Sequence, residues 1–323
     1  MIPRRIGVLT SGGDAPGMNT AIRAVVRSAS AHGIEVVGIE DGFDGLIRGK
    51  TRPLLPRDVG DILQRGGTFL QTARCDEMLT ETGRRKAIRH LNAVGLDGLI
   101  VIGGDGSLAG AEALHREGVA VVGIPASIDN DIWGTNMSIG VDTALNTIVE
   151  VVDKLRDTAT SHQRAFLVET MGRNSGYLAL MGGLVCGAEL SLIPEVDITL
   201  EEVGAAVTDA YARGKNHAFI VVAEGAKLDV HEVAAHLAGN DIGFESRVTI
   251  LGHVQRGGSP SAFDRLLASR LGVAAVDAIC DDRTGVMVGL SGREIGTVPL
   301  EEVAARSKGA NLAYHEVLKT LAR

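Results

Sequence analysis

The stretch "VAVVGIPASIDND", Val119–Asp131, joins an apolar run directly to a polar turn. Its first residues are small or β-branched and show no polar alternation, which is typical of a strand buried on both faces. The run then ends in Asp129 and Asp131, with Asn130 between them. Two interpretations are open. Asp and Asn favour turns because they bond their own backbone, and two carboxylates at the end of a buried strand can also form a catalytic pair.

The same pattern recurs along the chain and predicts the fold class. Apolar runs that end in glycine-rich turns and lead into helical patterns occur at 6–10, 98–104, 164–172 and 218–226. Buried strands separated by helices predict parallel sheets covered on both faces. We therefore expect a doubly wound α/β protein. The length allows one large domain or two, and because no Pro-rich linker divides the chain, two domains would form two interwound, Rossmann-like sheets that are mostly parallel. Ligands bind beyond the carboxyl ends of such strands, so the glycine-rich loops are the candidate sites.

The composition limits the class of protein further. The chain has 323 residues, of which 45% are hydrophobic and 22% charged, so it can bury a large core. A net charge of −8 argues against a nucleic-acid surface. The three cysteines are scattered without CxxC spacing, and we find neither a signal-peptide pattern nor an apolar run long enough to span a bilayer. We therefore expect a cytoplasmic protein with no nucleic-acid and no membrane partner.

One helix can be predicted in detail, over "AIRAVVRSASAHG", 21–33. Its buried stripe is expected at the helical spacing of Ile22, Val25, Val26 and Ala29. Gly33 is the expected C-cap. Arg23 and Arg27 are four positions apart on one flank and are interpreted by default as two solvated arginines.

Two glycine-rich loops have the features of phosphate sites. "TSGGDAPGMN", 10–19, is neither a dinucleotide fingerprint nor a Walker loop, but Gly12 and Gly13 let backbone N–H groups approach an anion. In "GLIVIGGDGSLAG", 98–110, glycines surround Asp105. That carboxylate is suited either to hold Mg²⁺ through its waters or to cap a helix. Ser107 is expected to cap the next helix.

Together these loops contain the groups needed for phosphoryl transfer to an alcohol. Of Asp129 and Asp131, one would accept the proton of the attacking hydroxyl, and the other would help to orient that hydroxyl or the metal. Five arginines are expected at loop positions, where they would bind phosphates. Each of them taken singly is more often a surface residue. They are Arg74, Arg164, Arg173, Arg247 and Arg256.

Seven motifs follow one another along the chain: "GVLTSGGDAPGMN", "RGGTFLQTAR", "VIGGDGS", "IDND", "MGR", "VVAEG" and "LGHVQRGG". In this order they resemble the bacterial ATP-dependent 6-phosphofructokinase family over nearly the whole chain. The resemblance implies transfer of a phosphoryl group from ATP, with Mg²⁺, to the 1-hydroxyl of fructose 6-phosphate. It also implies a homotetramer with shared active sites. The implied domains are an ATP- and Mg²⁺-binding domain, 1–140 plus 254–305, and a sugar-phosphate domain, 141–253 plus 306–323.

The resemblance also implies roles for individual residues. Asp129 corresponds to the catalytic base, and Asp131 corresponds to the neighbouring carboxylate of the same motif. Gly13 is implied to lie beside the ATP phosphates. Arg173 is implied to stabilise the charge on the transferring phosphoryl group. Asp105 is the implied Mg²⁺ ligand, and the nucleotide-binding positions are Gly13, Arg74, Cys75, Gly104, Asp105, Gly106 and Ser107. The implied sugar-phosphate positions are Ser127, Ile128, Asp129, Met171, Gly172, Arg173, Glu224, His253, Val254, Gln255 and Arg256, with Arg164 and Arg247 donated across a subunit interface.

A second anion site is implied for regulation. The resemblance assigns it to ADP as an activator or phosphoenolpyruvate as an inhibitor, and such an effector must bind two quaternary states with different affinity. The implied effector residues are Arg23, Arg27, Arg156, Glu189, Arg213 and Lys215.

The sequence departs from the family pattern near the donor site. Ala126 stands where glycine is usual, Ser127 replaces threonine but keeps the hydroxyl, and Phe43 replaces a tyrosine beside the adenine. Pyrophosphate-using relatives typically have Asp at the position of Gly106 and Lys at that of Ala126, so ATP is favoured. The alternatives are a pyrophosphate-dependent enzyme, a kinase for another ketose phosphate, a non-catalytic nucleotide-sensing paralogue and a purely structural subunit.

Overall fold

The computed structural model describes residues 3–240 and 243–322. The chain divides into two compact units, and it enters and leaves each of them several times. Unit 1 comprises Met1–Ile128, Ile132–Thr143 and Arg256–Ser307, and unit 2 comprises Asp129–Asp131, Ala144–Gln255 and Lys308–Arg323. The expected α/β class with two interwound, mostly parallel sheets is confirmed.

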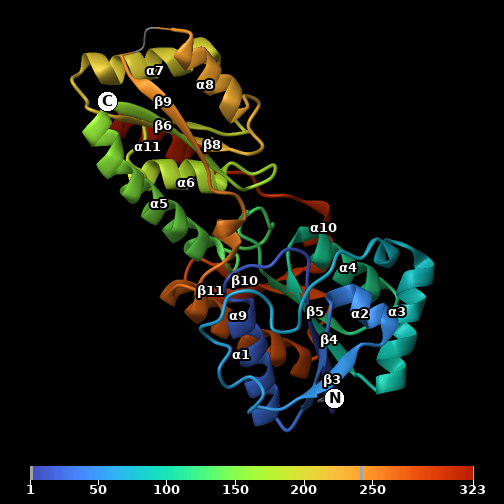
Figure 1. Ribbon diagram of the computed structural model, residues 1–323. Helices are drawn as coiled ribbons and strands as arrows, with labels where there is room; N and C mark the ends of the chain where they lie inside the picture. Colours follow the sequence, from blue (N-terminus) through green and yellow to red (C-terminus); the bar gives the residue numbers. More distant parts are fainter. Residues whose placement is uncertain (1–2, 241–242, 323) are drawn as a thin grey trace. The chain divides into compact units, whose positions relative to one another are not determined.

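Unit 1 contains a seven-stranded sheet with the strand order β11-β10-β5-β4-β1-β2-β3 (Figure 1). Its strands from β10 to β2 are parallel, while β3 and β11 pair antiparallel at the two edges. The central strands are buried along their length, which explains their uninterrupted apolar sequences. The strands are β1 Arg5–Ser11, β2 Glu35–Ile39, β3 Thr51–Leu54, β4 Gly98–Gly103, β5 Val121–Pro125, β10 Val286–Ser291 and β11 Glu294–Pro299.

Helices cover this sheet in two groups. Helices α2, α3, α4 and α10 share one apolar core with the strands, and α1 packs along α9. A Cβ at Gly272 of α9 would come within 2.5 Å of the Cβ of Ala24 in α1, so this glycine allows the two helices to approach closely. The helices are α1 Met18–Ala31, α2 Gly42–Arg48, η1 Asp76–Leu79, α3 Glu81–Val94, α4 Asp105–Arg116, α9 Ala262–Cys280 and α10 Leu300–Ala305.

Helix α1 confirms the predicted apolar stripe. Ile22, Val25, Val26 and Ala29 are all fully buried. The helix ends at Ala31, His32 is the cap residue, and Gly33 follows in the left-handed conformation with φ 72°. The C-cap is therefore His32 and not Gly33 as expected, and Gly33 occupies the next position, where glycines in the αL conformation commonly follow a helix.

Unit 2 contains a four-stranded, fully parallel sheet with the order β7-β8-β6-β9. Helices α7 and α8 close an apolar core with these strands, and the C-terminal helix α11 packs on α6 and β7 (Figure 1). Two of its helices, α5 and η2, include residues assigned to unit 1, at the start of α5 and at the end of η2. The elements are α5 Val141–His162, β6 Arg164–Thr170, α6 Tyr177–Cys186, β7 Leu190–Leu192, α7 Leu200–Ala212, β8 Ala218–Ala223, α8 Val230–Ala238, β9 Glu245–Ile250, η2 Gly252–Arg256 and α11 Ala313–Leu321.

No helix in the described part of the chain combines the length and the apolar character that crossing a bilayer requires.

Candidate functional site

The loops expected to carry chemistry follow the carboxyl ends of parallel strands in both units. In unit 1 they follow β1, β4 and β5, which are adjacent in the sheet. Because parallel strands end at the same edge, these loops lie together there.

The loop after β1 is built around two glycines and an arginine. Gly12 has φ 85°, a left-handed conformation that favours glycine. A Cβ at Gly13 would come within 2.4 Å of Nη1 of Arg256, and this Nη1 donates a hydrogen bond of 3.1 Å to the carbonyl of Asp14. The arginine guanidinium therefore lies directly against the loop, in a space that only glycine at position 13 leaves open.

The segment with Arg74 and Cys75 is tied to the same edge of the sheet. Thr72 donates its hydroxyl to the carbonyl of Gly12 at 2.7 Å, and Thr10 donates to the carbonyl of Gln71 at 2.8 Å. Arg74 is exposed and Cys75 is partly buried. Burial raises the pKa of the Cys75 thiol, so this side chain is neutral at physiological pH.

The loop after β4 leads directly into α4, which begins at Asp105. Gly104 is the N-cap residue and provides no side-chain cap, while Ser107 is buried inside the first turn. The expectation that Ser107 caps the helix is therefore wrong, because the helix starts two residues before it. Asp105 and Gly106 are exposed at the positive end of the helix, where anions are stabilised.

Within residues 3–240 and 243–322, no group of three or more His, Cys, Asp or Glu side chains could hold a metal. Asp105 is thus a single exposed carboxylate at a helix N-terminus. This fits Mg²⁺, which usually binds through one or two carboxylates and the phosphates of the substrate.

The loop after β5 leads into the carboxylate pair. Ala126 is buried and forms an isolated parallel bridge with Ile139, and the carbonyl of Ser127 accepts a 2.8 Å hydrogen bond from Ser138 Oγ. Ile128 is fully buried and is the last residue of this segment in unit 1.

Asp129, Asn130 and Asp131 belong to unit 2. Asp129 is only 3% exposed, and its Oδ2 lies 3.7 Å from Nε of Arg173. Asn130 is buried in the left-handed conformation, with φ 49°. Its Oδ1 accepts a 3.0 Å hydrogen bond from Nζ of Lys308, whose backbone N–H donates to the carbonyl of Asp131 at 2.9 Å. The segment therefore is a turn, and it holds a buried carboxylate beside a guanidinium.

The "MGR" loop follows β6 and presents Arg173 to Asp129. Arg173 has φ 51°, which is sparsely populated for residues other than glycine. One oxygen of Glu224 accepts from the N–H groups of Gly172 and Arg173, at 3.1 and 2.8 Å. A Cβ at Gly225 would lie 1.8 Å from the carbonyl oxygen of Arg173. Glu224 and Gly225 therefore hold and accommodate the strained loop, in which Met171 is buried.

The "LGHVQRGG" motif forms the short helix η2 after β9. His253 and Val254 are exposed, whereas Gln255 is fully buried and donates to the carbonyl of Gly252 at 3.1 Å. The motif divides between the units, because Gln255 is the last residue of its segment in unit 2 and Arg256 begins a segment of unit 1.

Arg164 and Arg247 lie elsewhere in unit 2. Arg164 is the first residue of β6, Arg247 is inside β9, and both form ion pairs with Glu245. The expectation that they occupy loops is wrong, because the strands extend through them. Arg173 follows the other end of β6, about 20 Å from Arg164 at ~3.3 Å per residue. Arg164 therefore does not lie beside Asp129 within one chain.

The residues expected to bind an effector are divided between the units. Arg23 and Arg27 lie on α1 in unit 1. In unit 2, Lys215 pairs with Glu189 at 2.8 Å, and Arg213 donates to the carbonyl of Ala322 at 2.9 Å. Arg156 contacts His217 at 3.2 Å. Burial, followed by the charge of Arg156, lowers the pKa of His217.

Two residues that contact these clusters, His217 and Lys308, are not recognisable as site residues from the sequence alone. Each is a single polar residue in a polar segment. Only the fold brings them to their partners.

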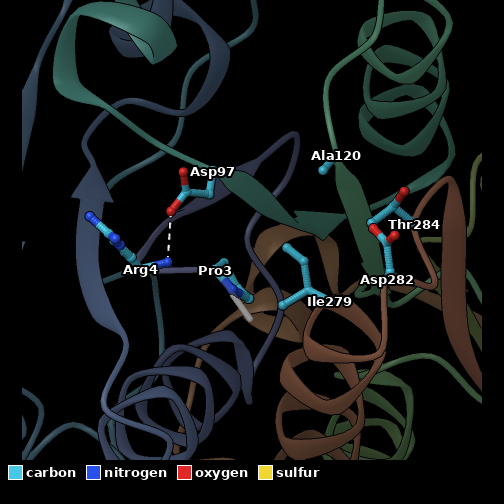
Figure 2. Close-up of a pocket in the computed structure, with 7 residues that line it drawn as sticks. All are labelled: Pro3, Arg4, Asp97, Ala120, Ile279, Asp282 and Thr284. Atoms are coloured by element: carbon cyan, nitrogen blue, oxygen red, sulfur yellow. Dashed lines mark hydrogen bonds between the residues drawn. The ribbon is translucent and has the colours of Figure 1, made fainter. Parts of the chain in front are cut away.

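A shallow depression of about 260 Å³ lies at the opposite end of the unit 1 strands (Figure 2). It is lined by residues that precede β1, β4, β5 and β10, and Asp97 accepts a hydrogen bond from the backbone of Arg4 at 2.7 Å. None of the expected site residues lines this depression, and no function is inferred from it.

Comparisons with known proteins agree with the fold. A family model described as Phosphofructokinase matches residues 5–279. The ATP-dependent 6-phosphofructokinase of Thermotoga neapolitana is 51% identical over 319 residues, which cover 98% of this chain and 99% of that protein. That of Bacillus pumilus is 53% identical over 292 residues, which cover 90% and 91%.

Solved structures show the same likeness. Pichia pastoris phosphofructokinase in the T-state superposes with a TM-score of 0.90 at 38% identity, over 94% of this chain but 35% of that chain. The pyrophosphate-dependent phosphofructokinase of Marinobacter aquaeolei gives a TM-score of 0.86 at 21% identity, covering 96% and 86%, which supports the fold alone.

These similarities and the observed fold define the class of protein: it is a doubly wound α/β protein with glycine-rich loops beyond its parallel strands. The chain belongs to the phosphofructokinase family.

Proposed function

We propose that this protein transfers the γ-phosphoryl group of ATP to the 1-hydroxyl of fructose 6-phosphate, giving fructose 1,6-bisphosphate and ADP. The observation that carries the proposal is the buried carboxylate of Asp129, with Nε of Arg173 3.7 Å from its Oδ2. The names of the relatives supply the donor and the acceptor.

Asp129 is the proposed general base. An alcohol is a poor nucleophile until its proton leaves, and a carboxylate within hydrogen-bond distance removes that proton as the new O–P bond forms. Burial keeps bulk water away from Asp129. Asp131 is the neighbouring carboxylate of the motif and would help to orient the attacking hydroxyl or the metal.

Arg173 is the proposed electrostatic partner of the transfer. Its side chain is 51% exposed and can reach a phosphoryl group while its backbone is held by Glu224. Charge that develops on the transferring group is stabilised best by a cation that is already in place.

Unit 1 carries the proposed nucleotide residues. The Gly12–Gly13 loop offers backbone N–H groups to phosphates, and Gly104, Gly106 and Ser107 lie at the N-terminus of α4. Asp105 would hold Mg²⁺, which neutralises phosphate charge during the transfer. Arg74 and Cys75 complete the proposed nucleotide positions.

The donor is assigned to ATP from the space around Gly106. A Cβ at this position meets nothing within 4 Å, and the residue is exposed. The site therefore has room for a nucleotide phosphate, whereas an Asp there would repel it. Ala126 supplies no cation to compensate pyrophosphate.

The remaining sugar-phosphate positions extend this proposal. Ser127, Ile128, Met171, Gly172, Glu224, His253, Val254, Gln255 and Arg256 would bind fructose 6-phosphate, and Arg164 and Arg247 would serve a neighbouring subunit of a homotetramer. The effector residues would bind ADP or phosphoenolpyruvate, and the enzyme would work in the cytoplasm.

Initial rates on one preparation test the proposal. Fructose 1,6-bisphosphate formation is measured with Mg²⁺ and either ATP or pyrophosphate as donor. We expect turnover with ATP alone. Turnover with pyrophosphate would refute the assignment of the donor, and binding of ligands without turnover would favour a nucleotide-sensing paralogue.

A further inference from the structure

Lys308 holds the carboxylate loop of unit 2 at two successive residues. Its amine donates a 3.0 Å hydrogen bond to Oδ1 of Asn130, 178 positions away in the chain. Its backbone N–H donates a 2.9 Å bond to the carbonyl of Asp131. The side chain and the backbone of one residue therefore fix neighbouring parts of the same turn.

The conformation of Asn130 makes this support important. Its φ is 49°, and the residue is 2% exposed. Asn tolerates the left-handed region better than most residues, but such a conformation persists only where the surroundings hold it. Because Asn130 lies between Asp129 and Asp131, its backbone angles determine the direction in which both carboxylates project.

The two carboxylates are associated with different cations. Arg173 lies 3.7 Å from Asp129. Burial lowers the pKa of the Lys308 amine to about 8, and the negative charge of Asp131 opposes this effect. Asp131 is thus the acidic group that favours the charged form of Lys308. A cation beside each carboxylate reduces the repulsion between two acidic side chains in one turn.

The segment around Lys308 also reaches the loop that carries Arg173. Two residues further on, the N–H of Ala310 donates to Oε1 of Glu195 at 2.9 Å. The carboxylate of Glu195 also accepts from the N–H of Gly176 at 3.0 Å, at the start of α6. The segment 308–310 therefore links the turn that holds Asp129 to the end of the "MGRNSG" loop.

We propose that Lys308 is a positioning residue for the phosphoryl transfer, acting through Asn130 and Asp131 to hold Asp129 in the orientation in which it accepts the hydroxyl proton. The inference rests on the proposed function. Lys308 has no place among the residues expected to touch ATP or the sugar, so its effect is transmitted by the turn.

Steady-state kinetics of Lys308→Met and Lys308→Arg test the role, with Lys319→Met on the exposed face of α11 as the matched control. A misplacement of a catalytic group by about 1 Å can cost ~100-fold in rate. We expect Lys308→Met to lower kcat by ~10- to 100-fold, while KM for fructose 6-phosphate and for ATP stays within about threefold. Lys308→Arg should recover most of kcat because it keeps a cationic donor, and Lys319→Met should match the wild type.

A kcat of Lys308→Met within twofold of the wild type, or an equal loss in Lys308→Arg, would overturn the proposal. A crystal structure of Lys308→Met decides the question independently of activity. Retention of the left-handed Asn130 and of the Asp129–Arg173 pair would also overturn it, and a displaced turn would support it. A wild-type chain that forms no fructose 1,6-bisphosphate would refute the proposed function, and the crystal structure would still report on Lys308.

Discussion

Nε of Arg173 lies 3.7 Å from Oδ2 of Asp129, although 44 positions separate the two residues in the sequence. The pair joins a nearly buried carboxylate to a half-exposed guanidinium on a left-handed backbone. A guanidinium beside a carboxylate stabilises the charged form of that carboxylate, and in the proposed function the same arginine then binds the transferring phosphoryl group.

Replacement of Gly13 by alanine tests the contact between the first loop and Arg256. The new Cβ would lie 2.4 Å from Nη1 of Arg256, so the guanidinium must move. We expect kcat/KM for fructose 6-phosphate to fall by ~10- to 100-fold, since about 1 Å of misplacement has effects of this size. Gly296→Ala, whose Cβ meets nothing within 4 Å, is the control. Equal kinetics in the two variants would show that the contact is unimportant.

The unit 2 cluster around Glu189 predicts a regulatory role for Arg213. This arginine donates to the carbonyl of Ala322, and Lys215 beside it pairs with Glu189. We predict that Arg213→Ala abolishes the response to the proposed effectors, ADP or phosphoenolpyruvate, and leaves basal turnover intact. The measurement is the rate as a function of effector concentration, with the exposed Arg283→Ala as control. A retained response would remove Arg213 from the effector site.

The alkaline limb of the pH–rate profile should depend on Lys308. Burial lowers the pKa of its amine to about 8, and Asp131 is the charged group that acts on it. Below that pH the ammonium form predominates, and above it the charge is lost. Wild-type kcat should therefore decline as the pH rises above about 8. Lys308→Arg should keep its rate to higher pH, because arginine stays protonated. Identical profiles would argue against a charged Lys308 in the active form.

Asp264 should be important for the stability of unit 1. Its buried carboxylate accepts from the N–H groups of Gly140 and Thr143, at 2.9 and 2.8 Å, and from the Thr143 hydroxyl at 2.6 Å. In Asp264→Asn, one acceptor becomes an amide N–H₂ that faces a donor. We expect this to lower the free energy of unfolding by about 2 kcal/mol, measured by urea denaturation. Asp282→Asn, at an exposed left-handed position, is the control and should be neutral. A neutral Asp264→Asn would show that the network contributes little.

The sequence was informative where local pattern and burial coincide. The runs at 98–104 and 119–124 predicted central parallel strands because a strand covered on both faces needs apolar residues at every position. The stripe from Ile22 to Ala29 predicted the buried face of α1. The edge strands β3 and β11 gave no such signal, because they pair antiparallel and are partly exposed.

Long-range contacts account for what the sequence did not reveal. Lys308 meets Asn130 across 178 positions, and Arg164 pairs with Glu245 only because β6 and β9 align in that register. Ser107 failed as a predicted cap because Gly104 already has extended angles and starts the helix earlier. None of these relationships follows from residue type or spacing.

The kinetics of Asp129→Asn test the proposed catalytic role most directly. Asn has nearly the same shape but cannot accept the hydroxyl proton, and general acid–base catalysis contributes ~100- to 10,000-fold. We predict a loss of kcat in that range, with KM for fructose 6-phosphate changed by less than about fivefold, because a base acts mainly in the transition state. A variant that keeps near-normal kcat would contradict the assignment of Asp129 as the base.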